Sequence, residues 1–204
     1  MSWAVFASVV VIHLAAAISP GPSFVLSVRT AAAEGFRVAA GLALGFGIGS
    51  MIWAVAALVG LALLFEIVPQ LFVVLKIAGG AFLIYLGIQM WRHAAAPMPQ
   101  IEATAAPRSL LGAVWLGTST FLANPKPAVF FGSIFVSVVP PDTSTAWLVP
   151  LVLIVGFNEW MWYMIVGRAF SLPKARAAYV KLKRWIDRGF GTLIGGFGLN
   201  IALR

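Results

Sequence analysis

Cysteine is absent from the sequence, which excludes disulfides, thiolate catalysis, cysteine-based metal sites and a redox carrier that needs a cysteine pair. Charge is also scarce, because charged residues make up 10% of the chain and hydrophobic residues 61%. So little polar surface cannot cover a soluble globule, and we expect an integral membrane protein. The apolar segments are continuous and lack the alternation of transmembrane β-strands. The expected fold class is therefore all-α and polytopic.

The apolar segments predict about six transmembrane helices at roughly 20 residues per span. We expect a single domain made of a first half (residues 1–92), a flexible linker rich in Ala and Pro (93–108) and a second half (109–204). The expected spans are Trp3–Val28, Val38–Phe65, Leu71–Trp91, Leu110–Val139, Trp147–Phe170 and Trp185–Leu203.

The net charge of +8 is distributed unevenly along the chain. The second and fourth connections between the expected spans hold no Lys or Arg, and the basic residues gather in the other three connections and their flanks. By the positive-inside rule those three connections face the cytoplasm and both termini lie outside. This pattern is a topology signal with possible lipid-headgroup contacts, so we expect the lipid bilayer as a partner and no nucleic acid. The basic residues are Arg29, Arg37, Arg92, Arg108, Arg168, Lys174, Arg176, Lys181, Lys183, Arg184 and Arg188.

Two of the expected spans contain helix-breaking residues. A proline inside a helix removes a backbone donor and leaves a carbonyl without its usual partner. In lipid, such a carbonyl persists only where it faces protein, an ion or a wet cavity. Corresponding interruptions in two halves of a membrane protein indicate a transporter binding site, so we predict broken first and fourth helices around such a site. The interruptions are Ser19-Pro20-Gly21-Pro22 and Asn124-Pro125-Lys126-Pro127.

Further positions recur between the two halves. With three spans in each half, the halves must have opposite orientations across the bilayer, which is an inverted repeat. The recurring positions are Gly80, Gly87 and Gln89, which are followed at a constant offset by Gly191, Gly198 and Asn200.

A glycine stripe in the second expected span predicts close helix packing. Gly41, Gly45 and Gly49 share one face of the helix at four-residue spacing. We favour a contact inside the chain over a dimer interface, and a homo-oligomer stays open.

Lys126 and Glu159 are the ionisable side chains that we single out inside the expected spans. Lys126 lies roughly 24 Å from the start of its span, so we favour a role in a wet cavity over snorkelling to the surface. Glu159, beside Asn158, is a candidate proton carrier or partner of Lys126, although a straight-helix count does not place the two at one level. We expect His13 to be a packing residue rather than a ligand.

Broken helices favour a zwitterionic substrate, because their N-termini present free N–H groups and their C-termini free carbonyls. A carboxylate would bind near Gly21 or Lys126, and an ammonium group near freed carbonyls or Glu159. Small organic cations and inorganic ions stay open. The predicted substrate-binding or coupling residues are Ser19, Pro20, Gly21, Pro22, Asn124, Pro125, Lys126, Asn158 and Glu159.

Both proline motifs, together with Gly167-Arg168 and the basic helix that leads to Arg184-Trp185-Ile186-Asp187-Arg188, resemble the LysE/RhtB family of bacterial amino-acid exporters. The resemblance covers nearly the whole chain. It implies a non-enzymatic secondary transporter in the bacterial cytoplasmic membrane. This transporter exports amino acids or related small metabolites by alternating access, with a proton gradient as the expected energy source and no cofactor or metal. The alternatives are a metal-ion or other cation exporter, and a lipid-handling membrane protein without solute flux.

Overall fold

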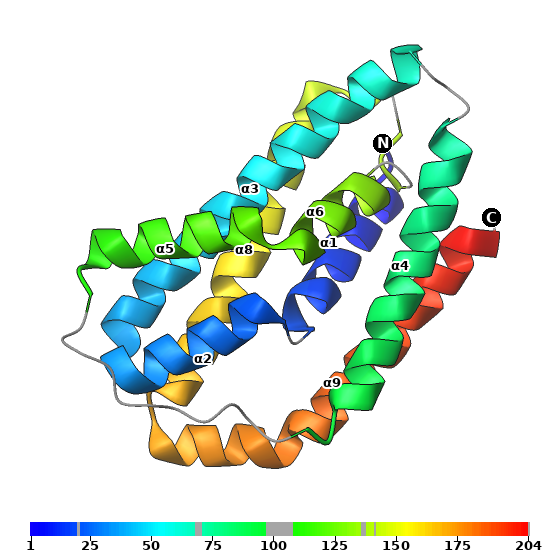
Figure 1. Cartoon of the computed structure of the whole chain (residues 1–204). Helices are drawn as coiled ribbons and strands as arrows, with labels where there is room; N and C mark the ends of the chain where they lie inside the picture. The colour runs from blue at the N-terminus through cyan, green and yellow to red at the C-terminus, as the bar shows by residue number, and fades with distance from the viewer. Residues whose placement is uncertain (20, 68–70, 97–107, 136–137, 141, 204) are drawn as a thin grey trace.

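The computed structural model describes the whole chain except residues 20, 68–70, 97–107, 136–137, 141 and 204 (Figure 1). Within the described ranges the chain is helical and contains no strand, so the all-α prediction is confirmed there. The elements in chain order are α1 (Trp3–Ile18), α2 (Pro22–Glu34), α3 (Phe36–Ile67), α4 (Leu71–His93), α5 (Leu110–Ala123), α6 (Pro125–Phe130), the π-helical turn η1 (Phe131–Phe135), α8 (Thr145–Phe170) and α9 (Pro173–Leu203).

Two described helices are long and apolar enough to cross a membrane by themselves. They are Phe36–Gly60, within α3, and Thr145–Phe170, which is α8. The pair α1 and α2 passes the same criterion together and would make a third span, bent by 59°. These segments agree with a membrane protein, and the full set of six spans stays a prediction.

The expected breaks in the first and fourth spans are present in the backbone. Between α1 and α2 the chain leaves the helical path, and between α5 and α6 it does so at Asn124, which ends one helix and begins the next. The first span also continues past its expected end at Val28 to Glu34. Gly35 then turns the chain into α3 with a φ of 86°, in the left-handed region that only glycine adopts without strain.

Long helices from the two halves pack against one another. Helix α3 packs along α5 and α8, while α4 packs along α9 (Figure 1). The predicted glycine stripe of α3 faces α5, where a Cβ on Gly45 would meet the backbone of Gly117 and Thr118. The preference for a contact inside the chain is therefore confirmed.

The last helix extends beyond the expected sixth span. Helix α9 begins at Pro173, before the expected start of the span at Trp185, so the basic segment between them is helical, as the sequence indicated. In Figure 1 this first part of α9 runs across the lower end of the molecule before the helix turns up beside α4. A search for apolar spans misses such a segment, although Ala, Lys and Arg favour helix and Pro suits the first helical position.

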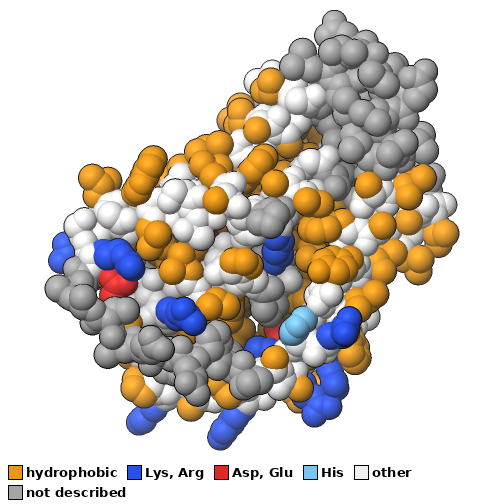
Figure 2. Space-filling view, viewed as in Figure 1, with side chains coloured by type: hydrophobic (Ala, Val, Ile, Leu, Met, Phe, Trp, Pro, Cys, Tyr) orange, Lys and Arg blue, Asp and Glu red, His pale blue; other side chains and the backbone are white. Residues whose placement is uncertain are grey.

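One end of the molecule gathers the basic side chains. The α2–α3 and α8–α9 connections meet at the lower end in Figure 1, and both termini lie towards the other end. Lys and Arg side chains crowd the lower half of the face in Figure 2. There Arg108, before α5, binds the buried carboxylate of Glu34 through its backbone N–H and its guanidinium, which ties the second half to the end of α2.

Candidate functional site

The first break exposes two helix ends to each other. Helix α1 ends at Ile18, and the backbone N–H of Ser19 donates to the carbonyl of Ala16 at 3.2 Å. Helix α2 begins at Pro22 with Gly21 as an extended N-cap that has no side-chain cap. Proline suits this first position because its missing N–H would have no partner in the helix. The break therefore presents carbonyls at the end of α1 and free N–H groups at the start of α2.

Asn124 makes the second break by capping two helices. Its backbone N–H donates to the carbonyl of Phe121 at 3.2 Å, which closes α5. Its side-chain Oδ1 accepts from the backbone N–H of Lys126 at 3.0 Å, which opens α6. Asparagine is among the preferred N-caps, and the proline after it takes the first helical position.

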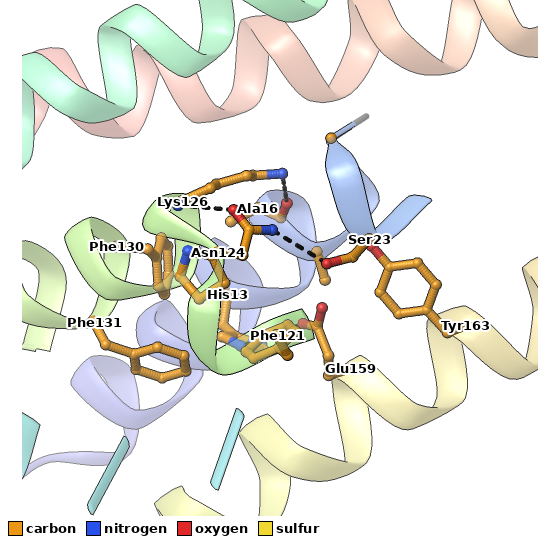
Figure 3. Close-up of a pocket in the computed structure, with 13 residues that line it drawn as sticks. His13, Ala16, Ser23, Phe121, Asn124, Lys126, Phe130, Phe131, Glu159 and Tyr163 are labelled. Carbon is orange, nitrogen blue, oxygen red and sulfur yellow. Dashed lines mark hydrogen bonds and ion pairs between the residues drawn. The ribbon is translucent and has the colours of Figure 1, made fainter. Parts of the chain in front are cut away.

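The two breaks bind each other directly (Figure 3). The ammonium group of Lys126 donates to the carbonyl oxygens of Ser19 at 2.7 Å and Ala16 at 3.0 Å, at the end of α1. The side-chain amide of Asn124 donates to Ser23 Oγ, on α2, at 3.2 Å. A cation is favoured at this position because the C-terminal end of a helix carries partial negative charge. The second break thus satisfies backbone carbonyls of the first through Lys126, and binds a side chain of α2 through Asn124.

A cavity lies where the two breaks meet α8. It leaves about 30 Å³ open to the centres of water molecules, so it can hold water. Figure 3 shows Glu159 and Tyr163 approaching it from α8, opposite Lys126 and Asn124. The lining residues are His13, Ala16, Ala17, Gly21, Ser23, Phe121, Asn124, Lys126, Pro127, Phe130, Phe131, Glu159 and Tyr163.

Glu159 faces His13 rather than forming an ion pair with Lys126. Its Oε2 lies 3.7 Å from His13 Nε2, and both side chains are buried. His13 Nε2 also hydrogen-bonds Ser50 Oγ at 3.3 Å, and Ser50 donates to the carbonyl of Val155 at 3.4 Å. Among the described residues His13 Nδ1 has no hydrogen-bond partner. His13 is therefore buried and packed against Phe130 and Phe131, as a packing residue would be, but it also forms part of the cavity wall and leaves one ring nitrogen without a partner there.

The predicted site residues fall into separate groups. The cavity wall includes Gly21, Asn124, Lys126 and Glu159, and Ser19 contributes a backbone carbonyl to Lys126. The Asn158 amide instead donates to the carbonyl of Val10 at 3.1 Å, so Asn158 ties α8 to α1.

Two of the three predicted prolines begin helices, and the third lies outside the described residues. Pro22 begins α2 and Pro125 begins α6. Pro20 and the side chain of Pro125 lie outside the described residues.

The sequence argument did not assign the aromatic wall or Ser50. Tyr163, on α8, also lines the cavity. Phe121, Phe130 and Phe131 flank the second break, which is the one signal that could have indicated them. Across the part of the chain that the structure describes, no three His, Cys, Asp or Glu side chains gather as metal ligands would.

A helical membrane protein with a small cavity between two broken helices, and with ionisable side chains on the cavity wall, has the architecture of a solute translocator. A family profile described as LysE type translocator matches residues 14–204, and the chain belongs to this family of membrane translocators, which are not enzymes. The resemblance to the LysE/RhtB family is thereby confirmed.

Curated relatives of the chain are bacterial. The chain is 35% identical to the threonine efflux protein of Escherichia coli (strain K12) and 34% identical to that of Salmonella typhi, each over 97% of both chains. It is also 35% identical to the chemotactic transduction protein ChpE of Pseudomonas aeruginosa, over 64% of this chain and 63% of that protein. No solved structure matches the chain.

Proposed function

We propose that this protein exports small neutral amino acids from the bacterial cytoplasm. The observation that carries the proposal is the cavity at which both broken helices meet, with the Lys126 cation and the Glu159 carboxylate on its wall. A zwitterion can place its carboxylate near Lys126 and its ammonium group near helix-end carbonyls or Glu159. The threonine efflux proteins, which are related over nearly their whole length, make threonine the first substrate to test.

The cavity wall favours a neutral side chain on the substrate. Lys126 places a cation there, and an additional cation on the substrate side chain in the same low-dielectric space would be repelled. The rest of the wall is largely aromatic, with Phe121, Phe130 and Phe131 beside Tyr163. Such a wall suits small apolar or hydroxylated side chains better than the long cationic chain of lysine.

We further propose that the two halves form an inverted repeat of three spans each. Reciprocal glycine contacts between α4 and α9 support this. A Cβ on Gly80 would meet the carbonyl of Gly198 and the reverse also holds, while Gly87 and Gly191 are related in the same way. Self-complementary contacts of this kind are what a two-fold axis produces. The sequence offset pairs Gly80 with Gly191 and Gly87 with Gly198, as such an axis requires.

Alternating access by these halves is the mechanism that we propose. The ammonium group of Lys126, on the cavity wall, joins the two breaks by its hydrogen bonds to the end of α1. Cargo that takes this position requires the two breaks to separate, and rocking of one half against the other would open the cavity to each side in turn. We place the basic end of the molecule in the cytoplasm, with both termini outside, because basic residues favour that side.

Proton coupling through Glu159 completes the proposal. This carboxylate is buried and faces His13 at 3.7 Å, with Lys126 and Tyr163 also on the cavity wall. Buried ionisable groups inside a span frequently carry protons in transporters. A proton on Glu159 would change the charge of the cavity by one unit, and so couple the proton gradient to the binding of cargo.

The test is flux through purified protein in liposomes. Labelled amino acids of neutral, basic and acidic classes would be offered with and without an imposed proton gradient. We expect gradient-driven flux of the small neutral class, and Glu159→Gln should retain exchange of labelled for unlabelled cargo but lose uphill flux. Asp142→Asn, at an exposed carboxylate, is the matched control and should behave as wild type. No flux of any amino acid would overturn the exporter and favour the lipid-handling alternative.

A further inference from the structure

Lys126 occupies a binding position that its own helix does not provide. Its ammonium group reaches from α6 to the last carbonyls of α1, at 2.7 Å from Ser19 O and 3.0 Å from Ala16 O. The last turn of α1 has no basic residue of its own. The end of α1 is thus a cation subsite formed by backbone oxygens, and the chain places one of its own side chains there.

The group held in this subsite is chemically the same as one group of the proposed cargo. A lysine side chain and an amino acid each end in a primary ammonium with three N–H donors. We propose that the carbonyls of Ala16 and Ser19 form the subsite for the α-ammonium of the substrate, with Lys126 as its internal competitor. This inference rests on the proposed export of amino acids.

When the substrate displaces Lys126, the substrate carboxylate becomes the new partner of the lysine. When the substrate ammonium takes the two carbonyls, Lys126 moves onto the substrate carboxylate, a short distance away in the same molecule. The unbranched side chain permits this movement. Its Cδ and Nζ pass beside Gly21, at 3.5 Å and 3.7 Å from where a Cβ would stand. Gly21 also leaves the N-terminus of α2 without a side-chain cap, which favours a carboxylate there.

This exchange of partners requires both charged groups of the substrate. An amine without a carboxylate would displace Lys126 from the carbonyls and would provide no anion for its ammonium group to bind. A carboxylate without an ammonium group would draw Lys126 away and leave the carbonyls without a partner in a setting that lacks bulk water. A zwitterion satisfies both and adds no net charge. Lys126 therefore makes the subsite selective for whole amino acids.

The experiment measures ligand affinity in purified protein, from ligand-dependent thermal stability. The ligands are threonine, 1-amino-2-propanol, which lacks the carboxylate, and 2,3-dihydroxybutyrate, which lacks the ammonium group. The variants are Lys126→Met and, as a second replacement that keeps a hydrogen-bond donor, Lys126→Gln. Lys181→Met, at an exposed lysine of the basic end, is the matched control.

We expect wild type and Lys181→Met to bind threonine at least about tenfold more tightly than the amine, as a charged hydrogen bond would give. In Lys126→Met and Lys126→Gln the ratio should fall to about one, because the amine gains access to the open carbonyls while the carboxylate loses its partner. Dihydroxybutyrate should bind weakly throughout. An unchanged ratio in both variants, or no gain in amine affinity, would overturn the inference.

Failure of the proposed function gives a different result. In that case no neutral amino acid binds to wild type or crosses the liposome membrane. If the amine still binds Lys126→Met more tightly than wild type, the ammonium subsite stands and the cargo is another primary amine. If the amine binds neither protein, the subsite is refuted as well.

Discussion

The substitution Gly45→Ala is the most direct test of how closely α3 packs against α5. In Gly45→Ala the new atom would stand 2.8 Å from the backbone N of Thr118 and 2.9 Å from the Cα of Gly117. It would come closer still to the carbonyl oxygen of Val114. These are backbone atoms, so no side-chain rotation can relieve the contact.

The expected cost follows from the separation that the helices must adopt. Bringing the Cβ to an ordinary contact of 3.4 Å from Thr118 N requires the helices to part by at least about 0.6 Å. Overpacking of this kind costs about 1–3 kcal/mol. The same movement strains the hydrogen bond from Thr118 Oγ1 to the carbonyl of Gly45, which is 3.1 Å long and worth about 0.6 kcal/mol in a membrane. The higher helix propensity of Ala offsets up to about 1 kcal/mol.

The assay is thermal unfolding of the purified protein, with Gly60→Ala as the control on the same helix. Among the described residues a Cβ on Gly60 meets nothing within 4 Å, so that variant gains the propensity of Ala without the contact. Gly60→Ala should therefore melt at or above the wild-type temperature, and Gly45→Ala several degrees below it, at about 2–4 °C per kcal/mol. If Gly45→Ala unfolded at the same temperature as Gly60→Ala, the close contact between α3 and α5 would be refuted.

Four further substitutions, in two sets, test a capping role and an ion-pair role by the same unfolding assay. Asn124→Ala should cost about 0.5–2 kcal/mol through loss of the α6 cap. Asn124→Asp keeps the cap acceptor but not the donor to Ser23, so it should recover much of that stability, and equal losses would contradict the capping role. Asp187→Asn removes the charged partner of buried Lys183, 2.8 Å away, and should cost about 3–5 kcal/mol. Restoring stability with Lys183→Met in the Asp187→Asn background would support an ion pair, and a further loss equal to that of Lys183→Met alone would argue against it.

Some features of the fold could be predicted because they depend on residues that are near one another in sequence. The breaks at residues 19–22 and 124–127 follow from the local chemistry of Pro, Gly and Asn. The face of α3 that carries Gly41, Gly45 and Gly49 follows from helical periodicity, and it indicated close packing without naming the partner. The basic first part of α9 lies outside the expected span because apolarity, the signal used to set the bounds of the spans, is weak before Trp185 although helix propensity is not.

The sequence by itself determined that this is a helical membrane protein with two interrupted spans. It also placed one ionisable side chain in each of two spans, Lys126 in the fourth and Glu159 in the fifth. Only the tertiary structure decided which residues of different helices contact one another. A straight-helix count could not bring Lys126 and Glu159 to one cavity, since each break changes the direction of its span. Nor could it show that Lys126 binds the end of α1, or that Glu159 faces His13. These contacts join residues more than a hundred positions apart, and they depend on how each helix is rotated and shifted against its neighbours. Helical periodicity fixes which residues share a face, whereas packing of the whole bundle fixes what that face meets.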